Sequence, residues 1–247
     1  MSGHGRTRNG ARRNACTRLL GVLALCQFTC SLAAPPDLTG VWMPETKRTQ
    51  PFPRNPPYTD AVRASIAESR QTYDEHLDDL GRSCLPYGMP QQVLGTAAYP
   101  LEIIQRRDRI TMVHELHMAI RRVFLDGRSI PADARPTRLG YSVGRWEGNT
   151  LVVETAALAP QQLGTQRRSP AMRIVERYTL LEGPQEPTGK SLRLTIRIED
   201  PETYTQPITL DKYYTWGSPR FEMGEYFCTE DLWNQLATGN KSRIPWR

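Results

Sequence analysis

Residues 99–127 read YPLEIIQRRDRITMVHELHMAIRRVFLDG, and this stretch decides the fold. Two runs rich in Ile, Val, Met and Phe, Leu101–Gln105 and Ile110–Leu125, flank a charged turn at Arg107 and Asp108. Such residues favour strands, so the stretch predicts a β-hairpin. A two-residue turn sets the register, although primed turns prefer Asn or Gly at those positions. The facing pairs are then Gln105 with Ile110, Ile103 with Met112, and Glu102 with Val113.

The two faces of this hairpin differ in composition, and side chains opposite each other share a face. The first face is apolar and holds Ile103, Ile110, Met112, His114, Leu116, Met118 and Ile120. The second mixes charged and small groups and holds Glu102, Ile104, Val113, Glu115, His117, Ala119 and Arg121. The mixed face either meets water or lines a pocket, in which two nearby carboxylates would push their pKa values apart.

The first 33 residues predict a signal peptide. Five arginines and no acidic residue precede Ala34, and an apolar run at Leu19–Leu25 lies after them. Ser31 and Ala33 form the small-residue cleavage pattern of exported proteins. The apolar run is too short to cross a bilayer, so no integral membrane segment is expected after leader removal. The sequence therefore predicts one mature domain, residues 34–247, located in the periplasm or secreted.

The mature chain is almost neutral. The 247-residue sequence has 32 Lys and Arg against 26 Asp and Glu, a net charge of +6. Without the five leader arginines, 27 basic residues face 26 acidic ones, which gives +1. Nucleic-acid binding requires a concentrated basic surface, so no nucleic-acid partner is expected. The composition leaves the oligomeric state open.

Two cysteines, Cys84 and Cys228, remain after the leader is removed. Two cysteines in an exported protein most simply form one disulfide. The alternative, a metal-binding or nucleophilic cysteine, lacks a neighbouring His or second Cys in the sequence. We therefore expect a disulfide that closes a loop of most of the mature chain.

The rest of the chain predicts more strands and few helices. Val62, Ile66 and Tyr73 recur at helical spacing after Thr59, which predicts an N-terminal helix ending near residues 76–81. Alternation predicts strands at residues 172–181 and 191–199, and further strands are expected near residues 37–42, 140–146, 150–154, 208–216 and 221–228. Asp231–Leu236 is expected to form a short closing helix. Eight or nine strands without strand–helix alternation indicate a mainly β fold, a single antiparallel β-barrel.

The chain resembles a family of exported bacterial proteins with lipocalin-like β-barrel architecture. The similarity covers most of the mature chain and rests on DLTGVW (37–42), CLPYGMP (84–90), EIIQ (102–105), GRWEG (144–148), LVV (151–153), VER (175–177) and EY with Cys228 (225–228). The resemblance implies a lipocalin-like barrel but no activity. Glu102, Glu115 and Arg121 match residues of the family, which makes them site candidates. Family members usually have an aromatic residue at position 114 and a small or acidic one at 117, where this chain has His114 and His117.

The remaining motifs do not identify a metal site, a nucleophile or a cofactor-binding site. His114-Glu-Leu-His117 resembles a zinc motif, but its i, i+3 spacing in strand-like residues sends the histidines to opposite faces, so no metal is predicted. No Gly-x-Ser-x-Gly elbow and no phosphate-binding glycine loop occurs, so no cofactor is predicted. Trp146 and Tyr226 could stack on a ligand, although large aromatic residues more often fill a core.

These observations predict a protein that binds a small, largely apolar organic molecule in the barrel interior, or at its mouth under the unpatterned loop Leu158–Pro170. Glu102, Glu115, His117 and Arg121 are expected to supply the polar contacts, with Trp146 and Tyr226 beside the ligand. The alternative is a cofactor-free isomerase, cyclase or lyase with Glu115 as base and Glu102 or His117 as acid. A third reading is a structural module whose barrel is filled by side chains.

Overall fold

The structure is a computed structural model that describes residues 34–72, 84–95, 99–161, 167–217, 221–226 and 228. The chain divides into two units, Met1–Ala33 and Ala34–Arg247, and every described residue belongs to the second. The predicted closing helix, Asp231–Leu236, and the predicted end of the N-terminal helix lie outside the described residues.

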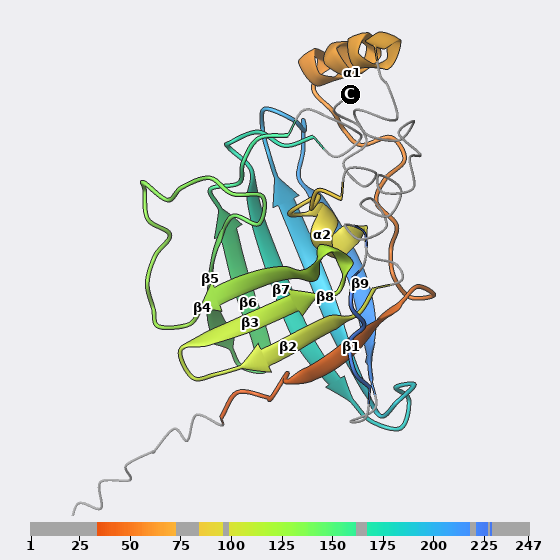
Figure 1. Cartoon of the computed structure of the whole chain (residues 1–247), viewed down its shortest axis with the longest axis vertical. Coiled ribbons are helices and arrows are strands. Elements are labelled where there is room, and N and C mark those ends of the chain that lie inside the picture. Colours follow the sequence, from red (N-terminus) through yellow and green to blue (C-terminus); the bar gives the residue numbers. More distant parts are fainter. Residues whose placement is uncertain are drawn as a thin grey trace, which may run out of the picture. The chain divides into compact units, whose positions relative to one another are not determined.

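Nine strands follow one another around a closed barrel (Figure 1). They are β1 Gly40–Glu45, β2 Leu101–Gln105, β3 Arg109–His114, β4 Ala119–Phe124, β5 Tyr141–Glu147, β6 Thr150–Ala156, β7 Arg173–Glu182, β8 Lys190–Glu199 and β9 Ile208–Trp216. The mainly β barrel is therefore confirmed.

One pair of neighbouring strands is parallel, so the prediction of a wholly antiparallel barrel is wrong. β4 pairs with β5 in parallel through Val123 with Ser142 and Phe124 with Val143. A parallel pair needs a crossover long enough to bring the chain back to the end from which the first strand started. Residues 125–140 supply that crossover, and they were not recognised as one from the sequence.

The β2–β3 hairpin has the predicted register. Ile103 lies opposite Met112 and Glu102 opposite Val113, and the Arg106 N–H donates to the Arg109 carbonyl at 2.9 Å across the turn. Neither central turn residue has a positive φ. The turn therefore tolerates Arg and Asp because it does not use the left-handed conformation that Asn and Gly favour.

The second arm of the hairpin is not one strand, which corrects the prediction for Ile110–Leu125. β3 ends at His114, a 3₁₀ turn follows at Leu116–Met118, and β4 returns so that Ala119 lies opposite His114. His117 and Met118 have φ values of 61° and 46° in this turn. The reversal changes which positions face inward, so Arg121 lies opposite Met112 on the buried face.

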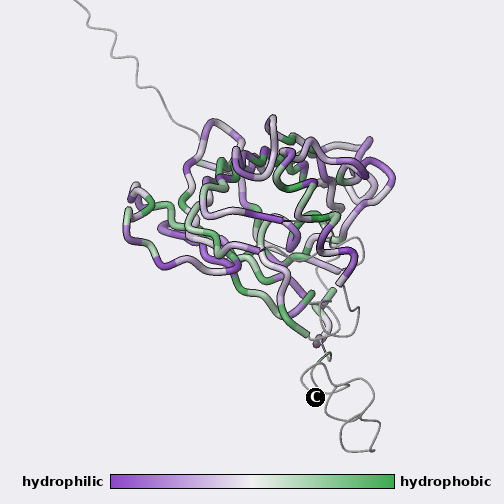
Figure 2. Tube along the Cα trace, turned by 90° about the horizontal axis from the view of Figure 1, so that it is seen from above, coloured by the Kyte–Doolittle hydropathy of each residue, from purple (hydrophilic) through white to green (hydrophobic). Residues whose placement is uncertain are grey.

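The barrel interior holds the hydrophobic core, and hydrophobic and hydrophilic stretches are interspersed along the trace (Figure 2). Alternate residues are buried along β3, β4 and most of β8 and β9, as expected for strands with one side facing a core, whereas β6 is buried at four consecutive positions, Thr150–Val153. A short helix, α2 (Gln91–Leu94), adds Val93, which is fully buried with the preceding Met89. The core includes Trp42, Leu101, Ile103, Ile110, Met112, Val123, Leu151, Val153, Tyr178, Leu192, Leu194, Ile196 and Tyr214.

The N-terminal helix, α1 (Asp60–Thr72), begins where predicted, and the Thr59 hydroxyl accepts the Val62 N–H at 3.4 Å. No residue of α1 is buried, although Val62 and Ile66 pack against the core. Within the described part of the chain, neither α1 nor α2 has the length and apolar character needed to cross a bilayer.

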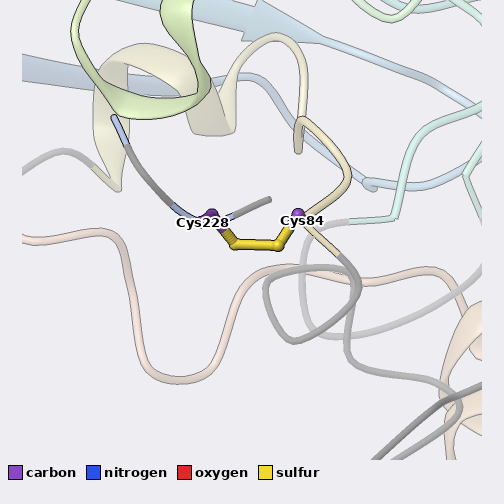
Figure 3. Close-up of a disulfide and its surroundings, with 2 residues drawn as sticks. All are labelled: Cys84 and Cys228. Carbon is purple, nitrogen blue, oxygen red and sulfur yellow. A yellow bond between two sulfur atoms is a disulfide. The ribbon is translucent and has the colours of Figure 1, made fainter. Parts of the chain in front are cut away.

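Cys84 and Cys228 form the predicted disulfide, with their Cα atoms 5.7 Å apart (Figure 3). The disulfide fixes the segment before Cys228, and the predicted strand there is wrong for residues 221–226, which form no strand. Instead, the Gly224 N–H donates to Glu115 Oε2 at 2.7 Å. We call residues 221–226 the C-terminal strap.

The loop predicted to cover the barrel mouth is fixed at both of its described ends. Arg168 is buried, and its guanidinium donates to the carbonyls of Ala159, Tyr87 and Met89. The Ser169 hydroxyl donates to Asp200 at 2.6 Å. The Arg168 contacts join the loop to the turn before α2, and the Ser169 contact joins it to the residue after β8; residues 162–166 lie outside the described part.

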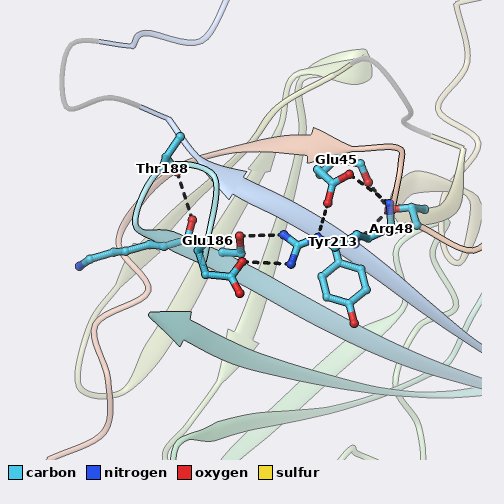
Figure 4. A network of polar contacts seen from close by, with 8 residues as sticks. Glu45, Arg48, Glu186, Thr188 and Tyr213 are labelled. Carbon is cyan, nitrogen blue, oxygen red and sulfur yellow. Dashed lines mark hydrogen bonds and ion pairs between the residues drawn. The ribbon is translucent and has the colours of Figure 1, made fainter. Parts of the chain in front are cut away.

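A polar network on the outside joins the end of β1 to the turn between β7 and β8 (Figure 4). Arg48 donates to Glu45 at 2.5 Å and to Glu186 and Ser191 at 3.0 Å each. Its guanidinium also lies 4.6 Å from the Tyr213 ring centroid. The backbone pairing of β1 with β9 closes the barrel, and the network lies beside this pair.

Candidate functional site

Five buried polar side chains form a hydrogen-bonded network inside the barrel. Arg121 pairs with both oxygens of Glu176, and their side chains are 2% and 0% exposed. Arg121 also donates to Ser142 at 3.0 Å and to Thr155 at 2.6 Å, and these two hydroxyls lie 2.9 Å apart. The Tyr178 hydroxyl donates to Glu176 at 2.7 Å.

The strand pattern explains why these residues meet. Ile174, Glu176 and Tyr178 alternate along β7, and all three are buried. Thr155 lies opposite Ile174 across the β6–β7 pair and opposite Ser142 across the β5–β6 pair. The ion pair and the three hydroxyl groups therefore lie on neighbouring strands, β4 to β7, and all of them point into the same part of the barrel interior.

The network keeps the Tyr178 phenol protonated. The Tyr178 pKa is raised well above its ordinary value by burial and by the charge of Glu176, so the phenol stays protonated and can donate. Removing two charges from water costs several kcal/mol per ion before their attraction is counted. Replacing a buried ion pair with apolar residues of similar volume is often neutral for stability, so the pair makes this part of the interior a candidate site.

His114 on β3 and Lys212 on β9 are further buried polar residues at inward strand positions, and Gln92 of α2 is fully buried. His114 is 2% exposed, and its pKa is lowered to about 3 by burial first and then by the charges of Arg121 and Lys212. Burial lowers the Lys212 pKa to about 8, and its ammonium donates to the Val93 carbonyl. His114 Nε2 and Gln92 Oε1 have no hydrogen-bond partner among the described residues. We call the network together with His114, Lys212 and Gln92 the interior polar cluster.

The lowered pKa of His114 predicts how the free energy of unfolding depends on pH. The pKa in the folded chain is below the ordinary histidine value of 6.5, which is taken for the unfolded chain. The unfolded chain therefore binds more protons between pH 6.5 and about 3, and stability falls as the pH is lowered through this window. Across the whole window, this proton binding lowers the free energy of unfolding by roughly 4–5 kcal/mol. Urea unfolding between pH 7 and pH 4 should show His114→Gln losing less stability than the wild type, and equal losses would contradict this assignment.

The structure divides the predicted site residues among three places instead of bringing them into one pocket. Glu102 lies on the outer face of β2, between Val41 and Val113. The neighbouring outer residues Ile104 and Ile120 are 38% and 52% exposed. Arg121 instead faces the interior, so the prediction that it shares a face with Glu102 is wrong. The mixed face of β2 and β3 is the outer face, and the apolar face, with Met112 and His114, lines the barrel.

Glu115, His117 and Tyr226 lie together at the turn between β3 and β4. Glu115 accepts its hydrogen bond from the C-terminal strap. The His117 ring lies edge-on to Tyr226 and Tyr87, with centroids 4.9 and 5.5 Å away, and burial lowers its pKa. Tyr226 also contacts Tyr99 at 5.8 Å. This group joins the strap to the barrel, whereas Glu115 was expected to face the pocket.

The remaining predicted residue, Trp146, lies on β5 opposite Leu151. It is half-buried and packs against the hydrophobic core. His114 and His117 are separated by the turn, with His114 in the interior and His117 beside the strap. Among the described residues, no group of three His, Cys, Asp or Glu side chains is placed to hold a metal ion.

The sequence held a signal for the residues that were missed. Glu176 and Lys212 occupy inward positions of clean alternations, Ile174-x-Glu176-x-Tyr178 and Leu210-x-Lys212-x-Tyr214. A charged residue at such a position must be paired or functional, because an isolated buried charge is too costly. Searching the apolar faces for charged residues would have identified both.

The fold places the chain in the class of closed β-barrels. No family model and no curated protein matches it, so the family resemblance stays a prediction. A solved structure described as the REP1-NXSQ fatty acid transporter is similar, with a TM-score of 0.38 and 10% sequence identity over 73% of this chain and 96% of that one. A likeness this distant carries no information on ligand or activity.

Proposed function

We propose that the protein is exported and binds a small, largely apolar organic molecule inside the barrel, with the polar end of the molecule at the interior polar cluster. The predicted leader and the disulfide support export to the periplasm or beyond. Binding sites for small molecules combine apolar walls with a few converging polar groups. The described interior has this composition, with the cluster set among Met112, Leu194 and Ile196.

The observation that carries the proposal is the pair of unpartnered buried atoms, His114 Nε2 and Gln92 Oε1. A buried polar atom without a partner costs about 1–3 kcal/mol. A ligand that donates a hydrogen bond to Gln92 Oε1 removes this cost, and His114 Nε2 accepts one as well when the neutral ring carries its proton on Nδ1. The ligand class is therefore an apolar molecule with a hydrogen-bond donor, such as a hydroxyl, an amine or a protonated acid.

A neutral fluorescent probe tests this binding. N-phenyl-1-naphthylamine has an apolar body and one N–H donor, and it should bind the full-length protein with increased fluorescence. Gln92→Met should weaken its binding about 2- to 10-fold, because one hydrogen bond contributes about 0.5–1.5 kcal/mol. The matched control is Gln206→Met at an exposed position, which should leave the affinity unchanged. Absence of binding by the wild type would contradict the proposal and favour a barrel filled by side chains.

A second candidate is cofactor-free acid–base catalysis at the same cluster, favoured by the Lys212 pKa of about 8. A general base works best when its pKa is near the operating pH. Neutral His114 adds a second group that can transfer a proton, and Tyr178 stays protonated as a donor. Under this candidate Lys212→Met abolishes turnover, whereas a pure binding protein shows only altered affinity.

A further inference from the structure

A groove lies between the proline-rich segment that leads to α1 and α1 itself. Its volume is about 750 Å³, within the range of roughly 300–1,000 Å³ that is usual for small-molecule sites. The lining combines apolar and cationic side chains and no carboxylate. It consists of Phe52, Pro53, Arg54, Asn55, Pro56, Tyr58, Arg63, Ile66, Ala67 and Arg70.

One side of α1 supplies the helical wall. Arg63, Ile66, Ala67 and Arg70 are spaced i, i+3, i+4 and i+7, so they form one stripe along the helix. A helix that only covered a core would place apolar residues at all four positions. Here two arginines occupy the ends of the stripe, and the apolar residues lie between them.

Both walls are held independently of any ligand. In the proline-rich wall, the Tyr58 ring stacks on Tyr204 with centroids 5.5 Å apart, and the Pro57 carbonyl accepts the Thr205 N–H at 2.7 Å. On the helical wall, Arg167 donates to the hydroxyls of Ser65 at 2.8 Å and Ser69 at 2.9 Å. The groove is therefore formed in advance, which reduces the entropy lost on binding.

The charged side chains that line the groove are all cationic. Arg63 pairs with Asp60 at 2.9 Å, but that carboxylate side chain is 98% exposed, so the pair is weak. Arg54 and Arg70 make no ion pair with any residue in the described part of the chain, and both are exposed. Three guanidinium groups over an apolar floor attract an anion and can hold it through paired hydrogen bonds.

We propose that this groove binds a small organic anion with an apolar or aromatic body. The body would lie against Phe52, Tyr58 and Ile66, and its carboxylate, sulfonate or phosphate group would be held by Arg54 and Arg70. The site is separate from the barrel interior, and it does not depend on the proposed interior ligand.

The test uses 1-anilinonaphthalene-8-sulfonate, an aromatic anion, in fluorescence titrations of the full-length protein. Ala67→Glu places a carboxylate in the groove, and Ala64→Glu makes the same change on α1 outside it; both alanines are exposed. Ala67→Glu should weaken binding about tenfold or more, and Ala64→Glu should have little effect. Replacing both Arg54 and Arg70 with Glu should abolish the same binding component.

Neutral N-phenyl-1-naphthylamine provides the comparison, because its binding should not change in these α1 variants. Equal anion affinity in Ala67→Glu and Ala64→Glu would overturn the proposal. Binding of vesicles containing phosphatidylglycerol that depends on Arg54 and Arg70, without binding of the free anion, would also overturn it and would identify a membrane surface as the occupant. Folding of each variant is checked by its urea midpoint.

Discussion

Replacing Glu176 with Leu should lower the free energy of unfolding by about 3–5 kcal/mol, because it leaves the Arg121 guanidinium buried without its carboxylate. Arg121 is 2% exposed, and Glu176 accepts hydrogen bonds from both Arg121 and Tyr178. The measurement is urea unfolding at pH 7, followed by circular dichroism. A loss of less than about 1 kcal/mol would show that the interior pair is solvated.

A double variant separates the charge effect from the loss of packing. Arg121→Met combined with Glu176→Leu removes both charges, and replacing a whole buried pair with apolar residues is often neutral. The double variant should therefore recover most of the stability lost in the single variant. As a control, Glu154→Leu breaks the exposed pair with Arg145 and should cost less than about 1 kcal/mol.

The disulfide gives the second large expected effect. Replacing Cys84 and Cys228 with Ser should lower the free energy of unfolding by about 2–5 kcal/mol, because the unfolded chain gains the freedom of a loop that spans 144 residues. Urea unfolding with and without a reducing agent measures this loss. The wild type should lose stability in the reducing agent, and the double Ser variant should not respond to it.

The same variant tests the role of the C-terminal strap. Without the disulfide, Tyr226 should lose its contacts with His117 and Tyr99, and tyrosine signals in near-ultraviolet circular dichroism should decrease. An unchanged signal together with an unchanged urea midpoint would mean that the strap is held by Glu115 and the aromatic contacts alone.

Local pattern predicted much of the fold. Two-residue turn geometry at Arg107 and Asp108 was enough for the register of β2 with β3, because the pairing follows from the turn alone. The alternation in residues 191–199 and 208–216 similarly predicted β8 and β9. The cysteine count of the mature chain predicted the disulfide.

The inward placement of Arg121 could not be predicted, because alternation does not show where a strand ends. Residues 115–118 contain no Gly, Pro or Asn, yet His117 and Met118 adopt positive φ values and the chain reverses there. A single missed reversal moved Arg121 to the wrong face. The interior polar cluster was missed for a different reason, because it joins strands from β3 to β9 that only barrel closure brings together.

The most direct measurement of the central claim is a crystal structure of the protein grown with N-phenyl-1-naphthylamine. We expect the probe inside the barrel, with its N–H donating to Gln92 Oε1 or His114 Nε2 and its rings among the apolar side chains of the wall. Ordered water or side chains filling that space, with the probe bound only outside the barrel or absent, would contradict the account.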